Sequence, residues 1–429
     1  MPVSLPQLPP ASPGGPSDAG DALGGVAARA IATSLYIHVP FCSHKCHYCD
    51  FYSIVDTRGR QEAFTDRLVD ELRALAPWAA RPLRTVFVGG GTPSMLEPRL
   101  WERVLGALHT HYDLGAGRGL ATCGDLAAGG GAPCEFTVEC NPETVTPDLL
   151  RVLVAGGVNR LSMGAQSFHA AHLVTLERRH DPASVPRAIA LARDAGVERL
   201  SVDLIYAVPG QTRDEWRHDL DAALALGTEH LSCYALTYEP NTAMTARLKR
   251  GEFARADEDL EADLFEDTVG VLRAHGLDRY EVSNFARPGA ECRHNLAYWR
   301  DDQWLAAGPS ASAHVAGRRW KNTPRLDDYL DRSRGGFSPI VDFEGPDARR
   351  ALAERLMTGL RLREGLDASE MLARAGALDA AAPARLEALA RKLAGEGLLS
   401  SGARWAPTDS GFLVADRLAV DFLCALDPR

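Results

Sequence analysis

Three cysteines in one eight-residue stretch are the side chains best suited to chemistry in this sequence. They occur in Cys42-Ser-His-Lys-Cys46-His-Tyr-Cys49, a C-x3-C-x2-C spacing that follows a short apolar run. Iron–sulfur clusters are held by cysteine thiolates, and three thiolates in one tight loop can bind three irons of a [4Fe–4S] cube. The fourth iron would stay open, which by analogy with zinc sites indicates a catalytic rather than a structural metal. The spacing therefore predicts a [4Fe–4S] cluster on Cys42, Cys46 and Cys49.

A structural zinc site is the alternative interpretation of the same loop. Zinc sites usually combine two cysteine pairs, or one pair with histidines further along the chain. No second pair is evident, and His44 and His47 lie inside the loop. The cluster is therefore favoured over zinc.

Composition excludes several classes of protein. The chain has 429 residues and a net charge of −10, which argues against a non-specific nucleic-acid binder because such proteins need a basic surface. No apolar run is long enough to cross a membrane, and the first thirty residues carry one basic residue, Arg29, and no signal-like core. We expect a cytoplasmic protein, where clustered thiols stay reduced and favour metal over disulfides.

Short β-branched runs alternate with amphipathic helical stretches from residue 34 onward. The expected strands are Leu35–Pro40, Thr85–Gly89, Phe136–Cys140, Arg160–Ala165, Leu200–Val208 and His230–Thr237. The expected helices between them are Gln61–Leu75, Arg99–His111, Thr146–Ala155, Val185–Ala195 and Arg213–Leu226. This alternation predicts an α/β fold with a parallel sheet in a partial β/α barrel, whose functional groups lie at the carboxyl ends of the strands.

The remaining segments suggest three domain-level divisions. Residues 1–33 are rich in Pro, Gly and Ala and are expected to form a disordered tail. The barrel and its extension should cover 34–345, with a glycine-rich insertion at about 114–133. Residues 346–429 predict a small, mostly helical domain with a short hairpin at Leu398–Pro407, which is either winged-helix-like or a packing lid on the barrel.

Glycines and polar residues stand at or just after the ends of the expected strands. Gly90, Gly91 and Thr92 close the second strand, where glycines let the backbone approach a ligand. Glu139 and Gln166 end the third and fourth strands, and Asp203 interrupts an apolar strand, where a buried charge needs a partner.

The cysteine spacing, with an aromatic residue before the last cysteine, resembles the radical S-adenosylmethionine (SAM) superfamily. In that superfamily the open iron is chelated by SAM, and the reduced cluster can cleave it. The chain from about residue 34 to its end is similar to the branch that contains the oxygen-independent coproporphyrinogen III oxidases. That resemblance implies SAM contacts from Tyr36, Tyr48, Gly90, Gly91, Thr92, Glu139, Gln166, Arg178, Asp203 and Thr237.

Two features separate the oxidases of this branch from its haem chaperones. The oxidases carry a fourth cysteine two residues after the third, and Phe51 occupies that position here. The segment His294-Asn295-Leu-Ala-Tyr298-Trp299 resembles the signature of HemW-type haem chaperones. Histidine is the commonest haem ligand, and aromatic rings can face a porphyrin, although such a histidine is also often a packed core residue.

The resemblance therefore implies a haem chaperone that binds a [4Fe–4S] cluster, SAM and haem and passes haem to acceptor proteins. The four haem-binding candidates are His294, Asn295, Tyr298 and Trp299. The alternative is an oxygen-independent coproporphyrinogen III dehydrogenase. The chaperone is expected to lack that activity and to be a monomer or a homodimer.

Overall fold

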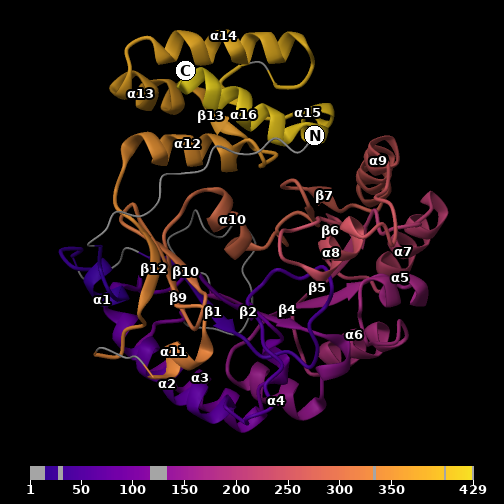
Figure 1. Ribbon diagram of the computed structural model, residues 1–429, viewed down its shortest axis with the longest axis vertical. Coiled ribbons are helices and arrows are strands. Elements are labelled where there is room, and N and C mark those ends of the chain that lie inside the picture. Colours follow the sequence, from indigo (N-terminus) through magenta and orange to yellow (C-terminus); the bar gives the residue numbers. More distant parts are fainter. Residues whose placement is uncertain (1–14, 28–31, 116–132, 332–334, 401, 428–429) are drawn as a thin grey trace.

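The computed structural model describes residues 15–27, 32–115, 133–331, 335–400 and 402–427. Two parts are visible in Figure 1: a large curved sheet with helices around its outer face, and a stack of helices at the carboxyl-terminal end. No helix in the described residues is long and apolar enough to span a membrane.

One sheet of twelve strands forms the frame of the larger part. Its strand order is β12-β11-β10-β9-β1-β2-β3-β4-β5-β6-β8-β7. The strands are β1 (Ser34–Val39), β2 (Thr85–Gly90), β3 (Glu135–Cys140), β4 (Arg160–Gln166), β5 (Arg199–Tyr206), β6 (His230–Ala235), β7 (Asp278–Arg279), β8 (Asn284–Ala286), β9 (Trp304–Ala307), β10 (Ser312–Val315), β11 (Arg318–Asn322) and β12 (Ile340–Glu344). Strands β1 to β6 are parallel neighbours, as predicted, and among the described residues β12 and β7 are unpaired edges, so the barrel is partial.

Helices lie on the connections between strands, and those between the parallel strands β1 to β6 cover the outer face of the sheet (Figure 1). They are α2 (Gln61–Leu75), α3 (Pro98–His111), α4 (Pro147–Ala155), α5 (Ala170–Thr175), α6 (Ser184–Asp194), α7 (Arg213–Ala225), α8 (Ala243–Lys249), α9 (Glu258–Ala274), α10 (Arg293–Trp299) and α11 (Leu326–Asp331). The apolar faces of α2, α3, α4, α6, α7, α9 and α11 and both sides of β1 to β6 form one continuous core, which explains the nearly uninterrupted apolar sequence of these strands. All five predicted helices between the strands are confirmed within one residue.

The carboxyl-terminal helices enclose a core of their own, built around Leu386, Trp405 and Phe422. These helices are α12 (Ala348–Gly359), α13 (Ala368–Leu378), α14 (Ala382–Gly395), α15 (Asp409–Leu413) and α16 (Ala415–Leu426). In the predicted hairpin Leu399 pairs with Pro407, while β14 (Arg404–Trp405) pairs with β13 (Leu366–Asp367). Helices α15 and α16 are separate because Val414 leaves the helical conformation at φ −122° and ψ 27°.

The prediction of a disordered tail over residues 1–33 is wrong for residues 15–27. A four-residue helix, α1 (Ala19–Ala22), lies against the sheet, and Leu23 is buried in the main core. The Ala19 amide donates to the Ser338 carbonyl at 3.0 Å. A helix this short has no periodicity to recognise in a sequence, since its burial depends on residues about 300 positions away. Residues 1–14, 28–31 and most of the predicted insertion (116–132) lie outside the described residues.

Candidate functional site

The cysteine loop leaves the carboxyl end of β1 and is closed at its base by backbone hydrogen bonds. The Cys42 amide donates to the Ile54 carbonyl at 2.9 Å, and the Ile54 amide donates to the Pro40 carbonyl at 2.8 Å. Cys42, Cys46 and Cys49 are half-buried free thiols. Burial raises the pKa of Cys49 to about 11. Without a metal the thiol is therefore neutral, and a bound metal would deprotonate it.

The three thiols suit a cluster better than a single metal ion. No group of three or more His, Cys, Asp or Glu side chains in the described residues is placed to hold one ion. A cubane cluster requires a different arrangement, in which each cysteine binds a separate iron. All three cysteines line one cavity of about 420 Å³, which we call the cysteine cavity. The donor set therefore fits a [4Fe–4S] cluster.

Nearly all residues predicted to contact SAM line the same cysteine cavity. They are Tyr48, Gly90, Gly91, Thr92, Glu139, Gln166, Arg178, Asp203 and Thr237. These residues come from the six parallel strands β1 to β6 and the connections that follow them. The carboxyl ends of parallel strands meet at one edge of the sheet, so residues far apart in sequence converge there. Tyr36 does not line this cavity and faces the neighbouring one described below.

The glycines let the turn after β2 pack directly against β1 and the residues that follow it. A Cβ added at Gly91 would lie 2.7 to 2.9 Å from backbone atoms of residues 39–41, and one added at Gly90 would lie 2.5 Å from the His38 ring. Gly90 also has φ +107°, which side-chain-bearing residues rarely adopt. Its amide donates to Glu139 Oε2 at 3.1 Å. The glycine-rich turn therefore keeps bare backbone at the cavity wall.

Two carboxylates lie deep in the wall of the cysteine cavity. Burial, with the nearby Asp203 carboxylate, raises the pKa of Glu139 to about 7. Burial also raises the pKa of Asp203, whose oxygens accept hydrogen bonds from Ser162 Oγ at 3.1 and 3.2 Å. Such carboxyl groups can accept hydrogen bonds from the hydroxyls of a ribose or from an ammonium group.

Arg178 carries an unused donor at the same cavity. Its Nη2 donates to Asn141 Oδ1 at 2.8 Å and to the Gly164 carbonyl at 2.7 Å, and its Nη1 lies 3.7 Å from Cys46 Sγ. Its Nε is buried and has no hydrogen-bond partner among the described residues. A buried donor without a partner is costly, and a ligand carboxylate would satisfy it.

A second cavity of about 330 Å³ lies inside the barrel next to the first. We call it the interior cavity; it shares Phe51, Gly90 and Glu139 with the cysteine cavity. Phe51 is 65% exposed and stands at the boundary between the two. Three residues of the predicted haem motif, His294, Asn295 and Tyr298, line the interior cavity together with Tyr36.

His294 is held by hydrogen bonds at both ring nitrogens. Nδ1 lies 2.7 Å from Thr85 Oγ1, and Nε2 lies 2.9 Å from the Tyr298 hydroxyl. The ring stacks on Phe87 with a centroid separation of 5.2 Å. Burial lowers the pKa of His294 to about 3, so the ring is neutral. A neutral imidazole has one acceptor nitrogen and one donor nitrogen, and both are used here, which makes His294 an anchor of α10.

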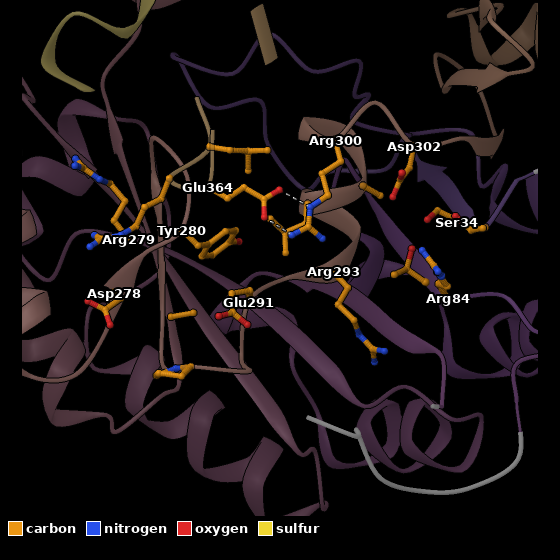
Figure 2. Close-up of a pocket in the computed structure, with 18 residues that line it drawn as sticks. Ser34, Arg84, Asp278, Arg279, Tyr280, Glu291, Arg293, Arg300, Asp302 and Glu364 are labelled. Atoms are coloured by element: carbon orange, nitrogen blue, oxygen red, sulfur yellow. Dashed lines mark hydrogen bonds and ion pairs between the residues drawn. The ribbon is translucent and has the colours of Figure 1, made fainter. Parts of the chain in front are cut away.

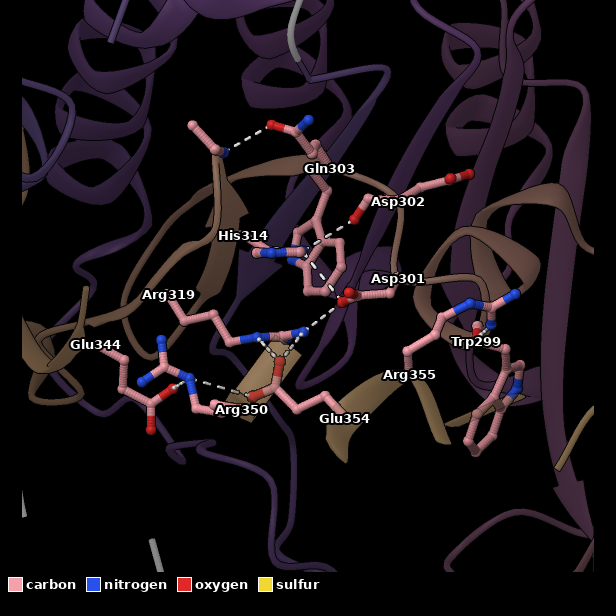
Figure 3. Close-up of polar contacts among 12 residues, drawn as sticks. Trp299, Asp301, Asp302, Gln303, His314, Arg319, Glu344, Arg350, Glu354 and Arg355 are labelled. Atoms are coloured by element: carbon pink, nitrogen blue, oxygen red, sulfur yellow. Dashed lines mark hydrogen bonds and ion pairs between the residues drawn. The ribbon is translucent and has the colours of Figure 1, made fainter. Parts of the chain in front are cut away.

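Trp299 is separated from the other motif residues. Figure 3 shows its ring beside Arg355 of α12, near the ion pairs that Arg319 makes with Asp301 at 2.6 Å and with Glu354 at 3.0 Å. The Trp299 carbonyl accepts from Arg355 Nη1 at 3.2 Å. Trp299 therefore does not line the interior cavity with the other three residues of the motif. Haem binding by these four residues stays a prediction.

Sequence reasoning missed buried polar residues of the interior cavity. Arg160 is 3% exposed and lines it, as does His230. His230 Nδ1 lies 2.7 Å from Ser201 Oγ and Nε2 lies 3.0 Å from the Tyr280 hydroxyl. Arg160 and His230 are the first residues of the apolar strands β4 and β6. A polar residue at that position was the sequence signal that could have identified them.

Two family profiles match the chain. Residues 36–223 match the radical SAM superfamily, and residues 347–414 match the HemN C-terminal domain. Curated relatives include the heme chaperone HemW of Mycobacterium tuberculosis, 36% identical over 391 residues, covering 89% of this chain and 92% of the relative. HemW of Bacillus subtilis is 32% identical over 361 residues, covering 84% of this chain and 91% of the relative.

The fold is similar to that of a solved oxidase. Coproporphyrinogen III oxidase (HemN) from Escherichia coli matches with a TM-score of 0.76 and 23% identity, covering 94% of this chain and 92% of that one. At this identity the match shows the shared fold alone.

Proposed function

Because the chain belongs to the HemW family of the radical SAM superfamily, we propose that it is a haem chaperone that passes haem to acceptor proteins. The relatives that carry the name heme chaperone match it over most of their length. The carrying observation within the chain is Phe51, which follows the cysteine loop where the oxidases of this branch have a fourth cysteine.

The cysteine cavity is proposed to hold the cluster and SAM. Cys42, Cys46 and Cys49 would bind three irons, and the cluster would supply an electron and one open iron for SAM. Arg178 Nε, buried without a partner, would donate to the SAM carboxylate. The bare backbone at Gly90 and Gly91 would receive the SAM amino group, and Glu139 and Asp203 would accept from its polar hydrogens. Gln166, Thr92, Thr237 and Tyr48 complete the proposed lining.

Haem is proposed to bind at α10, the helix that carries the motif. His294 anchors this helix to β2 through Thr85, and Asn295 Nδ2 lies 3.3 Å from the Tyr280 hydroxyl. Both contacts fix the helix and leave its other face to a ligand. Acceptor proteins are the proposed partners, and a monomer or homodimer in the cytoplasm is the proposed state.

The test is anaerobic reconstitution of the full-length protein with iron and sulfide, followed by titration with haem. We expect one [4Fe–4S] cluster and one haem per chain. The haem should move from this protein to an apo haem protein faster than the apo protein takes up free haem from solution. Protein that carries the cluster and retains no haem would overturn the chaperone proposal.

A further inference from the structure

A third cavity lies at the opposite end of the barrel from the cysteine loop. Its volume is about 590 Å³, within the range of roughly 300–1,000 Å³ typical of small-molecule sites. Ser34 and Thr85, the first residues of β1 and β2, line it, and so do residues that follow α12. Figure 2 shows arginines around its edge, and we call it the arginine cavity.

Helix α10 separates the arginine cavity from the interior cavity. Arg293, Leu296, Ala297 and Arg300, spaced as one helical face, line the arginine cavity. His294, Asn295 and Tyr298 lie on the other face and line the interior cavity. His294, Asn295 and Tyr298 thus fix α10 on the side of the interior cavity. The opposite face of the helix presents apolar and basic residues to the arginine cavity.

The wall of the arginine cavity combines apolar area with charge. Leu296 and Ala297, which are 8% and 5% exposed, supply apolar surface, and Tyr280 adds an aromatic ring. Five arginines and four acidic residues contribute to the lining. A wall that combines an apolar part with several basic groups suits a flat, largely apolar ligand that carries carboxylates.

Three of the five arginines already have partners. Arg279 Nη2 donates to Asp409 at 2.7 Å, Arg293 lies 3.7 Å from Glu135, and Arg300 pairs with Glu364 at 2.8 Å (Figure 2). The Arg300 pair is more than two-fifths exposed on each side, and exposed pairs of this kind contribute little. It can therefore be exchanged for a ligand carboxylate.

The remaining two arginines make no ion pair with any described residue. Arg84 and Arg363 are exposed, and they approach the cavity from the start of β2 and from the end of α12 respectively. Asp302 lines the same cavity as Arg84. Burial raises the pKa of Asp302, and the positive charge of Arg84 acts in the opposite direction. Arg84 therefore has an acidic neighbour, and its side chain is exposed.

We propose that the arginine cavity is the haem site, with the macrocycle against Leu296 and Ala297 and the propionates at Arg84 and Arg363. This inference rests on the proposed haem chaperone function and places the haem away from the cysteine cavity. Haem and SAM would then bind at the same time without competing.

The test compares porphyrin binding to full-length variants. The probes are haem, iron-free protoporphyrin IX and protoporphyrin IX dimethyl ester, whose propionates carry no charge. Arg84→Glu combined with Arg363→Glu should weaken haem and protoporphyrin IX binding at least tenfold and change the affinity for the diester less than threefold. The control, Arg151→Glu, reverses an exposed arginine on α4 and should leave all three affinities unchanged.

A second variant tests the apolar wall independently of charge. Ala297→Trp places an indole in the cavity and should weaken all three probes at least tenfold, with unchanged SAM affinity as evidence of a folded barrel. If the wild type binds haem while the double arginine variant and Ala297→Trp both bind as tightly as the wild type, the location is wrong. If the wild type binds no haem, the proposed function itself fails.

Discussion

Replacing His294 by phenylalanine separates the role of an anchor from that of an iron ligand. Phenylalanine keeps the ring that stacks on Phe87 and removes both hydrogen bonds, leaving the hydroxyls of Thr85 and Tyr298 without partners. Thr85 is 1% exposed, so its hydroxyl loses a partner that water cannot replace. An orphaned buried polar group costs about 1–3 kcal/mol, and Tyr298 is only partly buried, so we expect a total loss of about 2–4 kcal/mol.

The assay is urea unfolding of the apo protein at neutral pH, with His109→Phe as control. His109 is an exposed histidine on α3 that bonds one backbone carbonyl, so its replacement should change the unfolding free energy by about 0.5 kcal/mol or less. A double-mutant cycle between His294→Phe and Thr85→Val should give a coupling energy of at least about 0.5 kcal/mol. Wild-type stability of His294→Phe together with complete loss of haem binding would refute the anchor and make His294 the ligand.

Three further predictions concern the cysteine cavity. Replacing any one loop cysteine by alanine should abolish the cluster absorbance after anaerobic reconstitution and leave the circular dichroism spectrum unchanged, because these side chains are only half-buried. Gly91→Ala should weaken SAM binding at least tenfold in equilibrium dialysis, whereas Gly106→Ala, with open space at its Cβ, should stabilise α3 by about 1 kcal/mol. The folded-state pKa of Glu139, about 7, lies above its ordinary value of 4.5, so the stability of the apo protein should fall as the pH rises from 4.5 through 7. Glu139→Gln should remove up to about 3 kcal/mol of that loss. Urea unfolding that shows the same pH dependence in both proteins would contradict this prediction.

The parallel strands and the cysteine cavity could be predicted because their signals are local. Each strand is an apolar run buried on both faces, and the residues that follow each run must meet at one edge of the sheet. This geometry places Gly91, Glu139 and Asp203 beside the cysteines without knowledge of any side-chain contact.

The role of α10 could not be predicted because it depends on what packs against each of its faces. His294 bonds Thr85 across 209 residues of sequence, and Trp299 lies against Arg355 of a different part of the chain. The sequence motif names the residues and leaves their directions open. The same reason applies to Arg84 and Arg363, which become neighbours of one cavity only through the tertiary fold.

The most direct test of the chaperone account is conversion of coproporphyrinogen III under strictly anaerobic conditions. The reconstituted protein would be supplied with SAM, a low-potential reductant and coproporphyrinogen III, and the porphyrins would be separated by chromatography beside a haem titration of the same preparation. We predict one bound haem per chain and no protoporphyrinogen IX above the level of a cysteine-loop variant. Multiple turnovers to protoporphyrinogen IX would contradict the account and identify the chain as an oxidase.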